Sequence, residues 1–336
     1  MNKRHFTHSV LALAMGLSLA AASHAQQWKP TKPINLIVPW AAGGSTDQVT
    51  RVTAAELEKV LDQKIVIVNQ PGGSGSIGTK GVWDAPRDGY TWAAGAAQDL
   101  GVYQALGMLD VPAKDWHLFL SVANVPVVGA YAGGPFQTIG QLLDGMKAKP
   151  GQIKVSTGGV ASSSFNAIEL ITKAAGVTYR HVPYDGGNPA VISTVAGETD
   201  VTTQLAVEQA DHIRAKRIRP LAAVSDKPLE LEGFGTIEPI TKTLPNLKVA
   251  TNYFGIFIPK GVPPEVVATV TKIWNENIKN SEALKKYAVS RGALFQPVGG
   301  DDAQKAAAPA IAANAWLMHD SGKTKVSPDT LGIARP

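Results

Sequence analysis

The sequence INLIVPWAAGGSTD at residues 34–47 joins a short apolar run to a glycine-rich turn and the start of a helix. The run Ile34–Val38 predicts a buried strand, and apolar residues recur at helical spacing after Ser45. Glycine allows a sharp turn, and the free N–H groups of a helix N-terminus attract an anion without lysine or arginine. A carboxylate is a natural ligand for such a turn. The candidate binding residues are Trp40, Ala42, Gly43, Gly44, Ser45, Thr46 and Asp47.

A structural interpretation of the same residues stands beside this one. Gly43 and Gly44 also suit a plain tight turn, with Ser45 or Asp47 capping the helix. Ser45 followed by Gln48 reads as a capping box. These residues alone favour neither interpretation.

The chain after Pro33 alternates short β-rich runs with helical periodicity, which predicts an α/β fold with mostly parallel sheets. In such sheets the loops after the strands form the ligand crevice. A late helix is expected after Pro263 and Pro264. The expected strands are Ile34–Val38, Ile65–Val68, Tyr90–Ala94, Ile153–Ser156, Tyr179–Val182, Val201–Thr203 and Arg219–Val224.

Further strand-end loops supply hydroxyl and aromatic groups for the far end of a ligand. One loop lies at residues 157–164, and another lies at residues 183–187. Ordinary turn and capping chemistry is the alternative for each residue. The candidates are Thr157, Ser162, Ser163, Ser164, Tyr184 and Asp185, together with Gly73 and Ser74 of a second glycine-rich loop.

That second loop supports an enzyme hypothesis. Gly73, Gly75 and Gly78 match the dinucleotide pattern G-x-G-x-x-G, and Asp99 follows at about the spacing of the residue that binds ribose. However, the loop follows the second strand, and the helix after it lacks a long apolar stripe. An exported or nucleotide-dependent α/β enzyme using Gly73–Gly78 therefore remains the alternative function.

Other enzyme classes lack their motifs. No serine has glycines at both flanking positions of a nucleophile elbow, and there is no H-E-x-x-H motif. The absence of cysteine excludes disulfides, cysteine-ligated metals and thiol nucleophiles. We expect neither catalytic residues, a cofactor nor a metal site.

The first 25 residues predict a Sec-type signal peptide with cleavage after Ala25, because Lys3 and Arg4 precede an apolar run that ends at Ser23-His24-Ala25. An uncleaved anchor helix is the alternative. The remaining chain suits about two lobes. Basic residues cluster only at residues 214–219, without interleaved aromatic residues, so nucleic-acid binding is not expected.

Two apolar segments, Val122–Tyr131 and Asn252–Pro259, are candidate crossings between the lobes. A chain that leaves the first lobe once and returns once gives it two separate parts. We therefore expect residues 26–130 and 252–336 in lobe 1 and residues 131–251 in lobe 2, with the crossings acting as a hinge.

Several segments, taken in order, resemble the solute receptors of tripartite tricarboxylate transporters, also called the Bordetella uptake gene family. The resemblance rests on Ile37-Val38-Pro39 with Ala42-Gly43-Gly44 and Asp47, Asn69-Gln70-Pro71-Gly72-Gly73, Asp88-Gly89-Tyr90, Val182-Pro183-Tyr184, Arg219-Pro220-Leu221-Ala222 and Gly255-Ile256-Phe257.

The resemblance implies a two-lobed Venus flytrap fold in the periplasm. Such a receptor is a monomer without catalytic activity that closes on a small carboxylate. Its expected partners are a small and a large integral membrane subunit of the permease, with a sensor kinase as a further candidate. The first glycine loop would hold one carboxylate, and residues 157–164 with Tyr184 and Asp185 would set specificity.

Three positions depart from the family pattern. Phe165-Asn166 stands where the family usually has His-Leu, Asp185 where it often has a basic residue, and Trp40 where Phe is common. An acidic Asp185 would disfavour a second carboxylate, and Trp40 and Phe165 would favour a ring. The departures therefore point toward a monocarboxylate or an aromatic acid.

Overall fold

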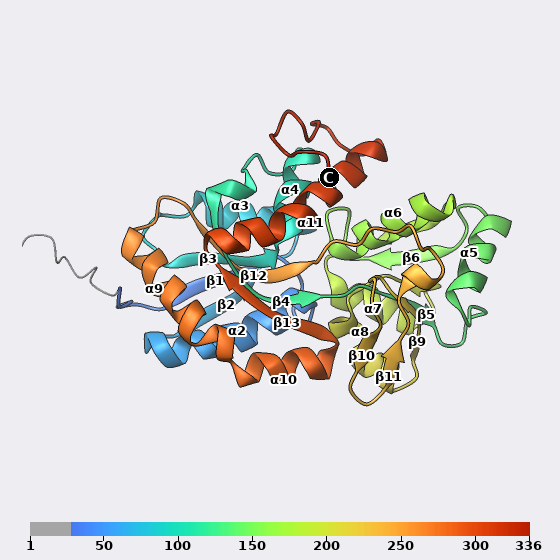
Figure 1. Cartoon of the computed structure of the whole chain (residues 1–336), viewed down its shortest axis with the longest axis horizontal. Coiled ribbons are helices and arrows are strands. Elements are labelled where there is room, and N and C mark those ends of the chain that lie inside the picture. Colours follow the sequence, from blue (N-terminus) through green and yellow to red (C-terminus); the bar gives the residue numbers. More distant parts are fainter. Residues whose placement is uncertain (1–27) are drawn as a thin grey trace, which may run out of the picture.

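The computed structural model describes residues 28–336, which form two α/β lobes side by side (Figure 1). The predicted signal peptide lies outside the described residues. The first lobe is built on a six-stranded sheet of order β13-β4-β12-β3-β1-β2. Its strands are β1 (Ile34–Val38), β2 (Ile65–Asn69), β3 (Thr91–Ala96), β4 (Trp116–Asn124), β12 (Tyr253–Pro259) and β13 (Ala293–Gly299).

The second lobe is built on a five-stranded sheet of order β7-β6-β8-β5-β9. An antiparallel pair, β10 (Leu229–Leu231) and β11 (Gly235–Ile237), lies apart from both large sheets. The strands of the second sheet are β5 (Val127–Tyr131), β6 (Lys154–Thr157), β7 (Arg180–Pro183), β8 (Val201–Thr202) and β9 (Ile218–Ala223).

Each large sheet has a parallel core of three strands. In the first sheet β1 lies between β2 and β3, and in the second β6 lies between β7 and β8, all parallel. The remaining strands of both sheets pair antiparallel. The loops after β1 and β6 therefore hold equivalent positions, at the strand ends where ligand crevices form in parallel sheets.

The helices cover both faces of the sheets. Short 3-10 helices occur at η1 (Gly73–Gly75), η2 (Ala113–Asp115), η3 (Ile240–Lys242) and η4 (Ile278–Asn280). The α-helices are α2 (Ser45–Leu61), α3 (Ser76–Asp84), α4 (Ala97–Ala105), α5 (Ile139–Ala148), α6 (Ser163–Ala175), α7 (Gly187–Val195), α8 (Ala206–Arg214), α9 (Pro264–Glu276), α10 (Glu282–Arg291) and α11 (Asp301–Asp320).

Side chains that alternate along the strands form separate cores on the two faces of the first sheet. Leu36 and Val38 pack with Trp274 of α9 in one apolar cluster, whereas Ile37 belongs to the cluster of α3, α4 and α11. The strand period of two explains this division. The first lobe is thus a sheet between two helical layers.

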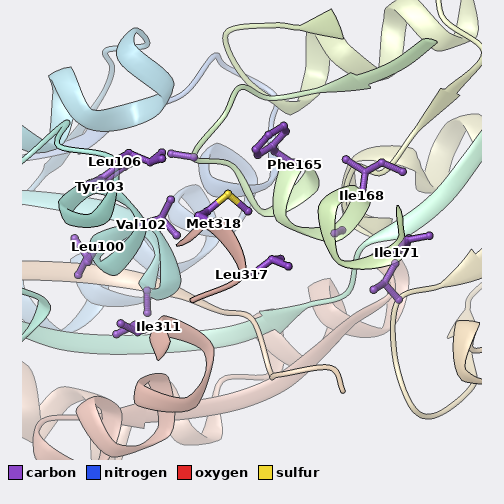
Figure 2. Packing of buried hydrophobic residues seen from close by; sticks show 14 of the residues in the cluster. Leu100, Val102, Tyr103, Leu106, Phe165, Ile168, Ile171, Ile311, Leu317 and Met318 are labelled. Carbon is purple, nitrogen blue, oxygen red and sulfur yellow. The ribbon is translucent and has the colours of Figure 1, made fainter. Parts of the chain in front are cut away.

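One apolar cluster continues from the first lobe into the second (Figure 2). Leu106 at the end of α4 and Met318 of α11 contact the same cluster as Phe165 and Ile168 of α6. Phe165 is only 3% exposed. Its ring is therefore part of the core that joins the lobes, and its small exposed part lines a pocket with Leu106 and Lys323 of the first lobe.

The sequence predicted the positions of seven strands well, but both sheets are mixed around a parallel core rather than mostly parallel. The start of α2 was predicted poorly. All seven expected strands are confirmed, with ends within two residues of β1, β2, β3, β6, β7, β8 and β9, and the helix after Pro263 is α9. The capping box is wrong, because Gly44 is the N-cap of α2 and makes no side-chain cap bond. Ser45 is instead the first helical residue.

The lobe boundary expected after residue 130 is placed too late. β5 already pairs with β8 and β9 of the second sheet. The chain therefore passes between the sheets at Val125 and Pro126, and it returns before β12, where Asn252 O accepts from Asn124 N at 2.9 Å. These two adjacent segments are the candidate hinge.

Candidate functional site

Five helices begin around one cleft between the lobes. Ser45 and Thr46 start α2, Ser163 and Ser164 start α6, and Gly187 starts α7. Asp99, in the first turn of α4, and Leu205, the N-cap of α8, line the same cleft. Within the part of the chain that the structure describes, no lysine or arginine lines it. The helix N-termini are therefore the groups at this cleft that carry positive partial charge.

The cleft encloses a cavity of about 30 Å³. That volume holds about two water molecules. Three hydrogen bonds cross between the lobes around it: Ala41 N to Asp185 O at 3.3 Å, Ser45 N to Glu208 Oε1 at 2.8 Å, and Gln98 Nε2 to Ser163 Oγ at 2.9 Å. An organic acid can enter only when the lobes move apart.

The first glycine loop is held in shape by Asp47. Gly43, at φ +79°, donates its N–H to Asp47 Oδ2 at 2.9 Å. Arg51 binds both carboxylate oxygens at 3.0 and 2.9 Å, and Asn69 donates to Oδ1 at 3.1 Å. Burial raises the pKa of Asp47, but these hydrogen bonds outweigh it and leave the pKa lowered. Asp47 thus positions the loop and lies outside the cavity lining.

Four of the seven predicted residues of this loop reach the cavity. Trp40, Gly44, Ser45 and Thr46 line it, whereas the exposed Ala42 and Gly43 and the buried Asp47 do not. Trp40 is 7% exposed and, with Phe254 at 3%, provides the aromatic surface of the cleft.

The second glycine-rich loop packs closely against Trp40 and Pro39 of the first loop. A Cβ at Gly75 would lie 2.8 Å from the Trp40 ring and 2.3 Å from the Tyr103 hydroxyl. A Cβ at Gly78 would lie 3.0 Å from Pro39 Cβ. These glycines of the dinucleotide-like pattern therefore permit close packing around the first loop. Gly73 and Ser74 lie in η1, outside the cavity lining, and Ser74 contacts Gly159 of the second lobe.

The serines of the loop after β6 are linked by hydrogen bonds. Ser162 caps α6 by accepting from Phe165 N at 3.2 Å, and it shares a 2.9 Å hydrogen bond with Ser164. Ser164 accepts from Gly158 N at 3.0 Å. The predicted residues Ser162, Ser163 and Ser164 all line the cavity. Capping and cleft lining are therefore combined in the same residues.

The remaining predicted residues of the second lobe lie outside the cavity lining. Thr157 pairs with His181 Nε2 at 2.7 Å. Tyr184 is half-buried, and the Asp185 side chain is exposed. Asp185 contacts the first lobe through its main-chain oxygen, which accepts from Ala41. Its carboxylate is therefore not the acidic group inside the cleft.

Two acidic residues that the sequence did not assign to the binding site stand inside the cleft. Glu208, in the first turn of α8, accepts from Ser45 N at 2.8 Å and from Leu205 N at 3.1 Å. Burial raises the pKa of Glu208, whereas these hydrogen bonds lower it, with a net rise. No salt bridge within residues 28–336 involves it.

Asp99 is the second of these acids. It is 3% exposed, and its Oδ1 has no hydrogen-bond partner among the described residues. Burial raises the pKa of Asp99 well above the ordinary value of an aspartate. The sequence had placed Asp99 only as a ribose ligand of a dinucleotide site, whereas it faces the interlobe cleft.

A second cavity of about 140 Å³ adjoins the hinge. Its polar lining includes Asn124, Asn166 and Asn252, whose side-chain amide atoms lack partners within the described part of the chain. Ser163 lines both cavities. The hinge is therefore flanked by a cavity in which three asparagine side chains stand among mostly apolar lining residues.

No cluster of histidine, aspartate or glutamate side chains within residues 28–336 has the arrangement of a metal site. No helix in that range has the length and apolar character of a membrane span.

Comparisons with known proteins place the chain in a family. Residues 49–307 match the family described as "Tripartite tricarboxylate transporter family receptor". The UPF0065 protein in the tcbD-tcbE intergenic region of Pseudomonas sp. (strain P51) is 32% identical over 290 residues, covering 83% of this chain and 84% of that protein.

Solved structures share the fold. The periplasmic binding protein BugD superposes with a TM-score of 0.80 at 22% identity, covering 88% of this chain and 99% of that one. Rpa4515 of R. palustris, solved with adipate, gives 0.78 at 24% identity, covering 87% and 98%. The fold is therefore that of a two-sheet periplasmic binding protein, and the family is one of transport receptors rather than enzymes. This chain belongs to the tripartite tricarboxylate transporter receptor family.

Proposed function

We propose that this receptor works in the periplasm, captures one small organic carboxylate between its lobes and delivers it to a tripartite tricarboxylate-type permease. The observation that carries the proposal is the meeting of five helix N-termini at a cleft whose described lining contains no lysine or arginine. Such main-chain donors stabilise a bound carboxylate. The adipate bound by Rpa4515 supports the same ligand class.

Capture requires motion about the two adjacent connections at Val125–Pro126 and Asn252. The cavity of about 30 Å³ is smaller than any organic acid, so a ligand enters an open cleft and the lobes then close on it. Closure surrounds the ligand with polar groups from both lobes, including Ser45 and Thr46 on one side and Ser163 and Ser164 on the other.

The lining favours a ligand with an apolar body. Trp40 and Phe254 present aromatic rings in the cleft, and such rings stack well on a planar ligand. We therefore propose a monocarboxylate or an aromatic acid as the ligand. The partners in transport are the small and large membrane subunits of the permease, with a sensor kinase as a further candidate, and the receptor acts as a monomer without a cofactor.

A thermal-shift screen tests this function. The chain from Gln26, purified by denaturation and refolding to remove carried-over ligand, is heated with aliphatic diacids, hydroxy and amino monocarboxylates and aromatic acids. A ligand at 100 times its Kd stabilises the fold by about 2.7 kcal/mol, which is several degrees in Tm. A selective shift with an acid is expected. A shift with nicotinamide nucleotides and with no acid would contradict the proposal.

A further inference from the structure

Glu208 occupies the position at the start of α2 where a ligand carboxylate is expected to bind. Its Oε1 accepts the N–H of Ser45, the first residue of α2, at 2.8 Å. Its Oε2 accepts the N–H of Leu205, the N-cap of its own helix, at 3.1 Å. One side-chain carboxylate thus connects the N-termini of α2 in lobe 1 and α8 in lobe 2.

The second lobe holds this carboxylate in place by itself. With its amide nitrogen facing Glu208, Gln204 donates to Oε2 at 2.9 Å, and its oxygen accepts from Gly158 N at 2.8 Å. A Cβ at Gly187 would lie 1.9 Å from Oε1, so only glycine there leaves room for the carboxylate. Glu208 therefore faces the cleft in the same position when the lobes separate.

A ligand carboxylate at the start of α2 would meet this resident one. Two carboxylates that share a buried site without a cation repel each other, and one of them must take up a proton. The resident carboxylate also lies against Gly187 at the start of α7, so the N-terminus of α6, at Ser163 and Ser164, is the one that remains for a single ligand carboxylate. The charge at the α2 end therefore disfavours the second carboxylate of a diacid.

Asp99 indicates which ligand group, other than a second carboxylate, would lie near the start of α2. Asp99 lines the same cleft, and its Oδ1 is buried and has no partner among residues 28–336. A buried acceptor without a partner is costly, and a ligand that donates a hydrogen bond removes that cost. Glu208 and Asp99 together form an acceptor surface that suits a hydroxyl or amino group.

We propose that Glu208 determines specificity: its carboxylate fills the anion position at α2, so the receptor selects a monocarboxylate that carries a hydroxyl or amino group at its other end. This inference rests on the proposed receptor function and specifies its ligand class. It is independent of Asp185, whose carboxylate lies outside the cleft.

The test compares acids of matched length. Succinate is paired with 4-hydroxybutyrate and 4-aminobutyrate, adipate with 6-hydroxyhexanoate and 6-aminohexanoate, and terephthalate with 4-hydroxybenzoate and 4-aminobenzoate. Binding to refolded wild type, Glu208→Ala and Glu208→Gln is measured by calorimetric titration. The exposed Glu198→Gln, in the same lobe, is the matched control.

The wild type and Glu198→Gln should bind a hydroxy or amino acid more tightly than the paired diacid. Removing the resident charge should strengthen diacid binding about tenfold or more, the scale of a charge-assisted hydrogen bond. Glu208→Gln keeps an acceptor for Ser45 and carries the test if Glu208→Ala fails to fold. The inference would be overturned if wild type bound the diacid more tightly than the paired acid. It would also be overturned if neither Glu208 variant changed the relative affinity for the two acids. Either result would leave the receptor function intact.

If no acid in the series binds, the proposed function is contradicted, and a second experiment tests the inference by itself. Acetate should then stabilise Glu208→Ala against heating more than it stabilises wild type, because it refills the position that the carboxylate left. Equal shifts in both proteins would show that the start of α2 has no affinity for a carboxylate, and the inference would fail.

Discussion

The main-chain N–H of Ser45 and Oε1 of Glu208 form a 2.8 Å hydrogen bond across the cleft. The two residues belong to different lobes, and both lie in the first turn of a helix. This bond breaks whenever the lobes part. The cleft is therefore closed by the same type of interaction, a carboxylate on helix N–H groups, that a carboxylate ligand would make.

Gly187→Ala should disturb Glu208 and lower stability. The added Cβ would lie 1.9 Å from Glu208 Oε1, so the carboxylate must turn away and give up its hydrogen bonds from Ser45 N and Leu205 N. The loss of hydrogen bonds to a charged group costs about 1.5–3 kcal/mol. Urea unfolding measures the loss. Gly140→Ala, in α5 with only Thr138 Oγ1 nearby at 3.8 Å, is the control and should be neutral or stabilising; equal stabilities would contradict the assigned packing.

Asp47→Asn should destabilise the first loop by about 1.5–3 kcal/mol at neutral pH, because it removes charged hydrogen bonds from Arg51 and the Gly43 N–H. The folded state lowers the pKa of Asp47, so its contribution is present above the carboxyl titration range of the unfolded chain and is lost as the pH falls through the folded pKa.

Urea unfolding at pH 7 and near pH 3 checks this pH dependence. The difference between wild type and Asp47→Asn should shrink at the lower pH. Asp144→Asn, at an exposed site with an 80% accessible side chain, should show little difference at either pH. A deficit of Asp47→Asn that stays constant with pH would exclude an ionic role for Asp47.

Asp99→Asn should have the opposite pH dependence. Burial raises the folded-state pKa of Asp99, so its favourable contribution is present below the unfolded pKa and is lost as the pH rises through the folded one. The variant should therefore gain stability over wild type toward pH 8, on the order of 1–3 kcal/mol for a buried unsatisfied group. Thermal unfolding between pH 5 and pH 8 measures the gain, and a gain that is largest at pH 5 would contradict it.

Phe165→Ala should cost about 3–5 kcal/mol, because the ring is 3% exposed in the cluster that joins the lobes (Figure 2). The ligand preference of the folded variant should remain that of wild type, because the ring does not line the cavity at the helix N-termini. Val160→Ala, at a side chain that is 37% exposed, is the control. An altered ligand series with unchanged stability would instead assign Phe165 to the binding site.

The sequence predicted the parts of the fold whose signals are local. Strands β1, β2, β3, β6, β7, β8 and β9 are short β-rich runs, most of them followed within a few residues by glycine, proline or serine, and each was found within two residues. The antiparallel strands β4, β5 and β12 adjoin the two connections between the lobes. Their pairing depends on contacts distant in sequence, so the lobe boundary was placed about five residues too late.

The loop residues of the candidate site were predicted from the sequence, whereas its two acidic residues were not. Loops rich in glycine and serine after β1 and β6 carry a local signal, and Trp40, Gly44, Ser45, Thr46, Ser162, Ser163 and Ser164 line the cleft. Glu208 and Asp99 lie within the first turns of helices, where acidic residues ordinarily suit the helix dipole. Only tertiary packing reveals that Glu208 also caps α2 of the other lobe. The one sequence signal for Glu208 is its place three residues after Leu205, at a strand-to-helix junction.

An engineered disulfide across the cleft tests the central claim most directly, because the native chain contains no cysteine. A Cβ at position 43 would lie 3.9 Å from Asn188 Cβ, within the range of about 3.5–4.5 Å for disulfides. Gly43 has φ +79°, so cysteine there is strained, but the oxidised and reduced forms of Gly43→Cys/Asn188→Cys carry the same strain and are compared with each other.

The measurement is a calorimetric titration of both forms with the acid that gives the largest thermal shift, the disulfide having been formed before the acid is added. If the ligand binds between lobes that must open, the reduced protein binds one acid per chain and the oxidised protein binds none. Equal binding by the oxidised protein would contradict capture in the interlobe cleft.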